Sequence, residues 1–596
     1  MNRGGFAAET QSEVKTMVKK LLKSLREYKK DSILTPLLVV GEVVLECLIP
    51  FVISRLVDKI QAGCSVAETA KYGGLLAAMA VASLIFGWAA GVTASRASCG
   101  FAKNIRADIF HKVQDFSFQN IDRFSTSSLV TRMTTDVTNV QMAFMMIIRT
   151  AVRAPLMIIF SFTMAAVMGG RLALIFAVLL PLLGVVIAAV MRKVMPIFKR
   201  AFKKYDNLNG TVQENVRGMR VVKAFVREDY ESRKFGKASD DLCVDFTKAE
   251  RTLAVAMPFL QLCLYINMIA IMFFGSRFII NGVPGINVGQ LSALITYGFQ
   301  ILSSLMMVAM IFVMIAMSGE SASRIVEVLD EEPTIKNPEN PIMSVPNGDI
   351  DFNNVSFRYS GKSDTDALSA VDLHIKSGET IGIIGGTGSS KSSLIQLIPR
   401  LYDVSAGSVS VGDNDVRKYD IEVLRDAVSI VLQKNELFSG TIKENLRWGN
   451  PNASDEELVE VCKMAAADEF ISAFPDGYDT FIEQGGANVS GGQKQRLCIA
   501  RALLKKPRVL ILDDSTSAVD TRTDALIRKS LAEYLPDTTK IIIAQRTASV
   551  ESADRIVIMD NGTINDVGTH KELLERNEIY KEVYYSQNKG GDGDEK

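Results

Sequence analysis

Histidine is almost missing from this sequence, because its 596 residues include only His111, His374 and His570. A metal centre built on three imidazoles would need all three, and they lie in distant segments of the chain. The seven cysteines are scattered without C-x-x-C spacing, so they indicate neither a zinc site nor a disulfide framework. The scarcity of both residue types argues against metal–imidazole chemistry.

An excess of charge of either sign is also missing, because Lys and Arg together number 67 and so do Asp and Glu. Without a basic excess, nothing draws the whole chain towards nucleic acid, and we expect no nucleic-acid partner. Hydrophobic residues make up 48% of the chain, charged residues 22%, and the mean hydropathy is +0.16. Such a chain is too apolar for disorder, and its composition points to membrane-embedded sequence.

Long apolar stretches are confined to the first half of the chain, and none follows residue 330. Each approaches the roughly 20 residues that cross a bilayer as a helix. Buried helices of a large soluble protein explain them poorly, since 172–191 carries no formal charge. We therefore predict an all-α transmembrane domain over 32–325 with six spans. The stretches are 33–57, 73–93, 142–168, 172–191, 253–274 and 288–317.

Positive charge is distributed unevenly over the connections between these spans. The long segments 96–139 and 192–252 are rich in Lys and Arg, whereas the short connections carry few. By the positive-inside rule, the long segments and both termini face the cytoplasm. We predict a multi-pass protein of the plasma (inner) membrane, in contact with lipid, whose helices extend as long arms into the cytoplasm.

The N-terminal segment, residues 1–31, precedes the first span without the pattern of a signal peptide. From residue 14 onwards, lysines and an arginine alternate with apolar residues in a helix-compatible run. This pattern predicts an amphipathic segment on the cytoplasmic membrane surface.

Charged residues inside the spans are costly, at about 2.5 to 3.5 kcal/mol each near the bilayer centre. Glu42 and Glu46 are four residues apart, as are Arg149 and Arg153, so each pair shares a helix face. The four side chains form either the polar wall of a substrate pathway or ion pairs between spans one and three. Both interpretations place them facing inwards.

Methionine is frequent in spans three, five and six, where Met268 and Met307 are the candidates for a substrate pathway. The flexible thioether suits adaptable apolar surfaces, which favours a lipophilic binding cavity. Ordinary helix packing is the alternative explanation.

A different kind of sequence follows the last span. Residues 326–347 contain several prolines and mixed charge, which predicts a linker. Strand-like runs then alternate with helical stretches, the pattern of an α/β domain, which we place at 348–585. The remaining 586–596, rich in Gly and Asp, are expected to be disordered. The predicted strands are 350–357, 380–385, 428–432, 509–512 and 540–544.

The second predicted strand runs into a Gly/Ser loop and a helix that begins near Lys391, the architecture of a phosphate-binding loop. Backbone N–H groups of such a loop cradle phosphates, Lys391 neutralises their charge, and Ser392 can ligate Mg²⁺. The strict G-x-x-x-x-G-K-[ST] pattern fails at Ser390, so this motif alone does not distinguish a phosphate loop from a Ser/Gly turn. The candidate nucleotide contacts are Gly385, Gly386, Thr387, Gly388, Ser389, Ser390, Lys391, Ser392 and Ser393.

Further elements follow in a fixed order, and together they resemble the ATP-binding cassette of ABC transporters. They are Tyr359, the loop at 385–392, Gln433, VSGGQ at 489–493, VLILDD at 509–514, SAVD at 517–520 and AQR at 544–546. Joined to the preceding spans, the chain from about 14 to 585 resembles a half-transporter of the exporter class. The membrane domain and the ATP-binding domain are then fused in one chain.

This resemblance implies ATP and Mg²⁺ as ligands and gives the matching residues their roles. Tyr359 would stack on adenine, Asp513 and Ser392 would support Mg²⁺, and Gln433 would contact Mg²⁺ and the attacking water. The signature residues would bind the γ-phosphate of ATP held by an opposing cassette, so a second half-transporter is needed. The signature and the following SAVD element supply the contacts Ser490, Gly491, Gly492, Gln493 and Asp520.

The chain departs from the family pattern at three positions of one half-site. Asp514 replaces the glutamate that acts as general base, Gln545 replaces a histidine, and Ser390 replaces a glycine. A carboxylate set back by one methylene holds the water poorly, and an amide carries no positive charge. Where the position of Ser390 requires a glycine conformation, the serine adds strain. We therefore predict the degenerate-site subunit of a heterodimeric, bacterial multidrug-type exporter. Its VSGGQ would serve the partner's competent site, while a homodimer with functional sites is the alternative.

Two stretches of the cytoplasmic arms, 119–127 and 217–225, match the short helices that dock on the cassettes in this family. An importer of siderophores with exporter architecture and a regulatory ATP-binding subunit are further alternatives. Lipophilic drugs, lipids and peptides all fit a large Met-rich cavity, so the substrate class stays open.

Overall fold

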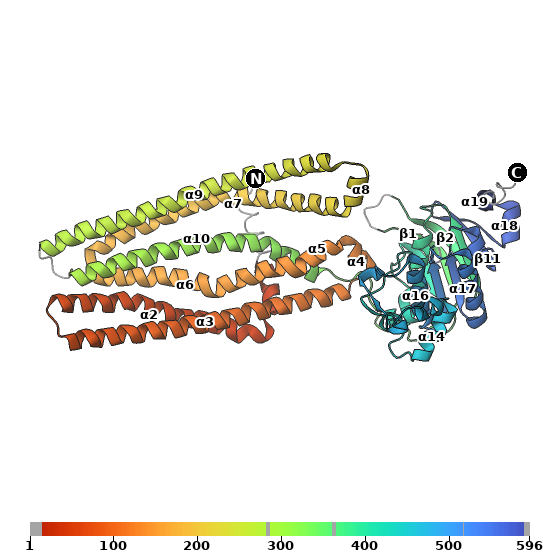
Figure 1. Ribbon diagram of the computed structural model, residues 1–596, viewed down its shortest axis with the longest axis horizontal. Helices are drawn as coiled ribbons and strands as arrows, with labels where there is room; N and C mark the ends of the chain where they lie inside the picture. The colour runs from red at the N-terminus through yellow and green to blue at the C-terminus, as the bar shows by residue number, and fades with distance from the viewer. Residues whose placement is uncertain (1–14, 282–285, 360–364, 516–517, 589–596) are drawn as a thin grey trace. The chain divides into compact units, whose positions relative to one another are not determined.

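The computed structural model describes residues 15–281, 286–359, 365–515 and 518–588. The chain folds into two compact units, and each unit is formed by two separate stretches of the chain (Figure 1). The helical unit comprises Met1–Gln114 and Thr126–Glu331, and the α/β unit comprises Asp115–Ser125 and Glu332–Lys596. Residues 1–14 and 589–596, which include most of the predicted tail, lie outside the described residues.

The helical unit is built from long helices that run alongside one another (Figure 1). α9 has 53 residues and would extend roughly 80 Å, far more than the ~30 Å hydrocarbon core of a bilayer. The predicted cytoplasmic arms are thus continuous with the spans. The elements are η1 (Arg26–Tyr28), α2 (Lys29–Gln61), α3 (Val66–Gln114), α5 (Thr126–Thr131), η2 (Arg132–Asp136), α6 (Val137–Gly169), η3 (Gly170–Leu172), α7 (Ala173–Arg217), α8 (Met219–Ala224), α9 (Glu228–Ile280) and α10 (Val288–Asp330).

Within the described residues, five helical segments are long and apolar enough to cross a membrane. One of them, Thr126–Phe198, contains α6 and the beginning of α7, separated by the turn η3. Gly170 begins this turn with φ +48, a conformation that glycine adopts without steric cost. The predicted third and fourth spans therefore lie on either side of a tight turn, and the other four predicted spans each fall on a separate helix.

The N-terminal segment packs against the helical unit. Leu21 and Leu25 are buried, and the Asn104 side chain on α3 donates to the Ser24 carbonyl at 2.9 Å. Lys20 pairs with Asp330 at the end of α10. The predicted placement at a membrane surface stays a prediction, and part of the segment lies outside the described residues.

A buried charge joins α10 to the π-helical turn η2 that precedes α6. Asp136 is fully buried and accepts hydrogen bonds from Ser321 Oγ at 2.8 Å and from Arg324 Nε at 2.8 Å. Arg132, also buried, donates to the Arg324 carbonyl and pairs with Glu327 at 2.8 Å. This cluster fixes the register between the two helices.

The α/β unit holds three sheets. The largest has the strand order β12-β11-β3-β10-β9-β6, a four-stranded sheet has the order β2-β1-β4-β5, and β7 pairs with β8. The strands are β1 (Ile350–Phe357), β2 (Leu368–Ile375), β3 (Thr380–Gly385), β4 (Ala406–Val411), β5 (Asn414–Asp415), β6 (Val428–Val431), β7 (Gly440–Thr441), β8 (Phe481–Ile482), β9 (Val509–Asp513), β10 (Thr539–Ile543), β11 (Arg555–Asp560) and β12 (Thr563–Gly568).

Strands β11, β3, β10, β9 and β6 are parallel, so their carboxyl ends share one edge of the sheet. In open α/β sheets this edge is where ligands bind. The helices of the unit are α4 (Phe118–Arg123), α11 (Lys391–Gln396), α12 (Ile421–Ala427), α13 (Ile442–Arg447), α14 (Asp455–Met464), α15 (Asp468–Ser472), α16 (Gly491–Leu503), α17 (Thr521–Tyr534), α18 (His570–Arg576) and α19 (Glu578–Asn588).

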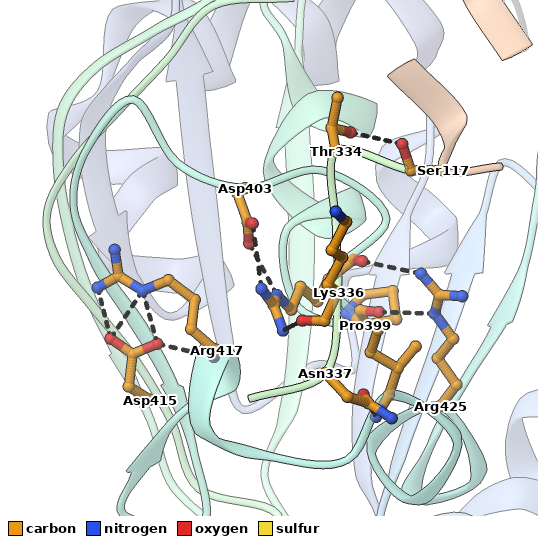
Figure 2. Close-up of polar contacts among 11 residues, drawn as sticks. Ser117, Thr334, Lys336, Asn337, Pro399, Asp403, Asp415, Arg417 and Arg425 are labelled. Carbon is orange, nitrogen blue, oxygen red and sulfur yellow. Dashed lines mark hydrogen bonds and ion pairs between the residues drawn. The ribbon is translucent and has the colours of Figure 1, made fainter. Parts of the chain in front are cut away.

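The predicted strands at 350–357 and 380–385 have the bounds of β1 and β3. Those at 428–432 and 509–512 differ from β6 and β9 by one residue at the C-terminal end, and 540–544 is shifted by one residue from β10. α10 runs to Asp330, so the first residues of the predicted linker are helical. Beyond it the chain is irregular, and Figure 2 shows how it is fastened to the α/β unit. Thr334 bonds to Ser117, and Asn337 Nδ2 donates to Asp420 Oδ2 at 2.7 Å.

Candidate nucleotide-binding site

The phosphate loop follows β3 at the carboxyl edge of the large sheet. Lys391 begins α11, and its Nζ donates to the carbonyl oxygens of Gly385 at 2.8 Å and Gly386 at 2.9 Å. A third contact joins Nζ to Ser389 Oγ at 3.2 Å. Burial lowers the pKa of Lys391, because it penalises the charged form. The lysine is thus held over the loop, and its charge suits an anion bound there.

Ser390 has the left-handed backbone conformation, with φ +70 and ψ +24. The sequence raised the question whether a serine adds strain here, and this geometry answers it. A non-glycine residue pays a steric cost in this region, of about 1 to 2 kcal/mol. Gly388 two residues earlier also has a positive φ, +86, but as a glycine it is not strained.

Two consecutive aspartates lie beside the loop, Asp513 as the last residue of β9 and Asp514 directly after it. Asp513 is 3% exposed and accepts a hydrogen bond from the Ser392 side chain. Asp514 is 9% exposed, and its Oδ2 accepts from Gln545 Nε2 at 3.0 Å and from Gln433 Nε2 at 3.5 Å. The parallel register of β9 and β10 explains the first of these contacts, since Asp513 pairs with Ile543.

Burial raises the pKa of both aspartates, because the charged carboxylate loses water. The hydrogen bond from Ser392 opposes this shift at Asp513, and those from Gln433 and Gln545 oppose it at Asp514. The positive charge of Lys391 also lowers the pKa of both aspartates. The site therefore gathers two buried carboxylates and one cation at the end of the strands.

Tyr359 follows β1 and reaches the helix of the phosphate loop. Its hydroxyl lies 2.8 Å from Ser393 Oγ, and its ring meets Tyr402 edge to face, with centroids 5.2 Å apart. The side chain remains 42% exposed, so part of the aromatic surface is open. Burial of the rest raises the pKa of its hydroxyl.

The signature residues lie at the beginning of α16. Ser490 caps this helix, and its side chain and that of Gln493 form a capping box. A Cβ at Gly492 would lie 2.8 Å from the Ala518 carbonyl, which explains the glycine there, while Gly491 has more room. The described contacts of these residues are local, and the structure does not bring them to the phosphate loop.

Asp520 serves a structural purpose, since its carboxylate accepts from the Thr523 backbone N–H at 2.9 Å and caps α17. Thr387 is exposed in the phosphate loop. Thr516 and Ser517, the latter part of the predicted SAVD element, lie outside the described residues.

In the helical unit, Arg153 joins both acidic residues of the first span. It pairs with Glu42 and, at 2.8 Å, with Glu46, so α2 and α6 are linked by charge. Arg149 lies one turn away, near Gly91 of α3. The predicted ion pairing between spans one and three is therefore present for Arg153.

Arg153 also lines a cavity of about 460 Å³ between α6 and α10, so the polar-wall interpretation remains compatible with the pairing. Met307 belongs to the same cavity, together with Met157, Phe299, Gln300 and Ser303. Met268 does not, because it lies in an apolar groove along α9. Arg153 and Met307 thus line one surface, and Met268 lines another.

Sequence reasoning missed Tyr402 and Asp122, which contact each other beside Tyr359. The Tyr402 hydroxyl donates to Asp122 Oδ2 at 2.6 Å, from a loop after α11 to helix α4. Asp122 lies in the stretch 119–127 that the resemblance singled out, but Tyr402 belongs to no motif named from the sequence, and their proximity depends on residues 115–125 folding with the α/β unit. No sequence signal could have paired them.

A helical unit of membrane-spanning length followed by a phosphate-loop α/β unit defines a nucleotide-dependent membrane transporter. The family model described as the ABC transporter transmembrane region matches residues 32–315, and the ABC transporter model matches 368–517. The chain belongs to the ABC transporter family. The resemblance and the fold class inferred from the sequence are both confirmed.

The chain is 36% identical over 570 residues to the uncharacterised ABC transporter ATP-binding protein YfiB of Bacillus subtilis, covering 96% of this chain and 98% of that protein. It is 33% identical over 572 residues to the uncharacterised ABC transporter ATP-binding protein Rv1273c of Mycobacterium tuberculosis, covering 95% and 97%. A bacterial Atm1-family ABC exporter with ATP bound has the same fold, with a TM-score of 0.82, 22% identity, and coverage of 94% and 99%. The architecture is that of an exporter-type transporter with an ATP-binding domain.

Proposed function

We propose that this chain is one half of a heterodimeric ABC exporter whose own phosphate loop binds ATP but hydrolyses it slowly. The observation that carries the proposal is the environment of Asp514. Its carboxylate is shorter than a glutamate and accepts hydrogen bonds from two amides, Gln433 and Gln545. A general base needs direct contact with the water that it deprotonates, at about 2.6 to 3.2 Å.

Gln545 adds to this defect because an amide has no acid–base chemistry near neutral pH. It donates to Asp514 but cannot carry a positive charge that would stabilise a developing negative charge on phosphate. Ser390 adds strain to the loop that holds the phosphates. All three departures concern the half-site formed by this chain's phosphate loop, which supports a division of labour between unlike subunits.

ATP binding itself is supported by the remaining groups. Lys391 supplies a cation held over the loop by carbonyl oxygens, the loop backbone supplies N–H donors, and the exposed part of Tyr359 supplies a surface for adenine. The buried Asp513 and the Ser392 hydroxyl beside it are hard oxygen donors that fit Mg²⁺. When bound, the ion would neutralise phosphate charge.

The signature at the beginning of α16 is proposed to act on the partner's ATP. Its 13-residue helix presents N–H groups and the positive end of its dipole, and both suit a phosphate. Its VSGGQ sequence keeps the glycines that allow a close approach. This chain would therefore complete a competent site on the partner while contributing little hydrolysis of its own.

In the helical unit, the cavity that contains Arg153 and Met307 is the proposed substrate pathway. Its lining of Met and Phe with a few polar groups suits a lipophilic substrate, such as a drug, a lipid or an apolar peptide. We place the protein in the plasma membrane with both termini in the cytoplasm. α4 and α8 are the proposed helices that transmit cassette motion to the spans.

The test is ATP hydrolysis by the purified chain alone, compared with the double variant Asp514→Glu/Gln545→His. We expect near-background turnover in the parent and a rise of about 10²-fold in the double variant, because general-base catalysis contributes at least that much. Lys391→Ala in either background serves as the control for contaminating ATPase. Brisk parent turnover that Lys391→Ala abolishes would instead establish a homodimer with functional sites.

A further inference from the structure

The loop after α11 contacts three parts of the α/β unit that lie far apart in the sequence. It consists of Pro399–Asp403, and Figure 2 shows how it is held. Arg425 donates to the carbonyls of Pro399 at 3.3 Å and Arg400 at 3.0 Å. Arg400 in turn pairs with Asp403 at 2.9 Å. These bonds make the loop rigid.

Arg400 occupies an unusual conformation within this loop. It is 6% exposed and has φ +51, which costs a non-glycine residue steric strain. Its guanidinium also donates to the Lys336 carbonyl of the linker at 3.4 Å. Such strain persists only where the surroundings hold it, so the loop is fixed against both α12, through Arg425, and the linker.

Tyr402, in the middle of the loop, is 7% exposed and contacts both the adenine candidate Tyr359 and helix α4. Its ring lies edge to face with Tyr359, with centroids 5.2 Å apart, and near Phe118 of α4, with centroids 6.0 Å apart. Its hydroxyl donates to Asp122 of α4 at 2.6 Å. The buried side chain of Tyr402 thus connects Tyr359 with helix α4.

Helix α4 is fastened to the linker as well. Asn120 Nδ2 donates to the Glu332 carbonyl at 2.9 Å, and Asn120 Oδ1 accepts from the Thr334 backbone N–H at 3.2 Å. Ser117 bonds to Thr334, as Figure 2 shows. A displacement of Tyr402 would therefore reach α4 and the linker together.

We propose that Tyr402 is a positioning residue that reports occupancy of the base site to α4. A base stacked on Tyr359 restricts that ring, the ring restricts Tyr402, and the hydroxyl of Tyr402 orders α4 through Asp122. The signal originates at the base and not at the phosphates. This inference depends on the proposed role of Tyr359 in binding adenine, but not on slow hydrolysis or on a heterodimer.

The test is hydrogen exchange of residues 115–125 in the full chain, with and without a non-hydrolysable ATP analogue that carries the adenine base. We expect the analogue to slow exchange at least threefold in the parent. Inorganic tripolyphosphate, which has no base, should bind without this protection. Equal protection by tripolyphosphate would overturn the proposal.

The decisive variant is Tyr402→Phe, which keeps the ring and removes the hydroxyl. We expect the dissociation constant of the ATP analogue to stay within twofold while the protection of 115–125 falls at least threefold. Tyr419→Phe is the matched control, because Tyr419 is also buried and its hydroxyl donates to the Val411 carbonyl, away from α4. If Tyr402→Phe retains the same protection as Tyr419→Phe, the proposal is wrong.

Asp122→Ala removes the acceptor of the same hydrogen bond from the exposed side of α4 and should reproduce Tyr402→Phe without touching the core. Tyr359→Ala tests the underlying role of Tyr359. If it leaves the affinity for the analogue unchanged, adenine does not stack there and the relay is overturned. The proposed slow hydrolysis is tested separately by turnover, so the two failures are distinguishable.

Discussion

Two residues of the nucleotide site hold backbone conformations in the left-handed region, Ser390 with φ +70 and Asp514 with φ +48. Aspartate tolerates this region better than most residues, because its short side chain can hydrogen-bond locally. Serine has less compensation, so the strain at Ser390 is the clearer target. Both residues are also departures from the family pattern, which links the local strain to the chemistry of the site.

Ser390→Gly should stabilise the α/β unit by about 1 kcal/mol, because glycine relieves the strain of the left-handed conformation. The measurement is thermal or denaturant unfolding followed by Trp448 in a Trp88→Phe background. Thr387→Gly in the same exposed loop is the control, since Thr387 has no positive φ and glycine there only adds unfolded-state entropy. A loss of stability in Ser390→Gly would show that the serine is not strained.

Asp514→Asn should raise the melting temperature of the α/β unit near neutral pH. Burial holds the folded pKa of Asp514 above its unfolded value, so the carboxyl favours folding below the unfolded pKa. That contribution is lost as the pH rises through the folded pKa. The advantage of the variant should therefore be present at pH 7.5 and vanish towards pH 4.

Asp520→Asn is the control of opposite sign. The pKa of Asp520 is lowered by the backbone N–H of Thr523, so its charged form stabilises the fold above the unfolded pKa. Its replacement should cost stability at neutral pH and little at low pH. The account of the buried carboxylate fails if Asp514→Asn and Asp520→Asn respond to pH in the same direction.

At this scale the sequence predicted which residues meet but not how they are held. The resemblance to the ATP-binding cassette grouped Lys391, Asp513, Asp514 and Gln545 in one site, and in the structure they gather because parallel strands end at one edge of the sheet. The sequence shows that Ser390 stands where the family has a glycine, but it does not show the backbone conformation. The left-handed φ of Ser390 therefore became known only from the structure. The contact between Tyr402 and Asp122 depends on tertiary packing alone.

Among the elements, the π-helical turn η2 depends most on a single side chain. Its last residue, Asp136, is completely buried against α10 with hydrogen bonds from Ser321 and Arg324. π-Helical turns are rare and cost regular hydrogen bonding, so they persist where such contacts hold them. The ion pair therefore determines how α6 meets α10.

Asp136→Ala should destabilise the helical unit by about 3 kcal/mol, because it removes one partner of a buried charge pair. Trp88 fluorescence in a Trp448→Phe background reports this unit during thermal unfolding. Thr134→Ala, at an exposed position whose hydroxyl only bonds its own helix, should change little. Equal effects of the two variants would mean that the pair contributes nothing.

Hydropathy located the spans because a helix that crosses a bilayer must be apolar throughout its length. Hydropathy does not locate the ends of helices outside the membrane, which explains why α10 runs past the predicted boundary at 325. The family pattern, not periodicity, indicated that 119–127 includes a docking helix. α4 (Phe118–Arg123) begins one residue before this stretch, overlaps its first half and contacts Tyr402.

For the whole molecule, fusion of a membrane unit and an ATP-binding unit in one chain is established by the fold and the family. What one chain cannot supply is the opposite half of each ATP site, since the signature residues of the described chain keep local contacts. In the proposed heterodimer the two halves belong to unlike chains, with Asp514, Gln545 and Ser390 weakening one half-site while VSGGQ is kept. The asymmetry in this proposal lies in hydrolysis, and ATP binding is retained.

The most direct test of this claim is the identity of the nucleotide that the purified chain retains. The full chain is incubated with MgATP, separated from free nucleotide, quenched in acid and analysed by chromatography, with Lys391→Ala as the binding control. The account predicts that bound nucleotide remains ATP over many minutes and is lost in Lys391→Ala. Bound nucleotide recovered as ADP, at a level that Lys391→Ala abolishes, would contradict it and would make Asp514 an adequate base.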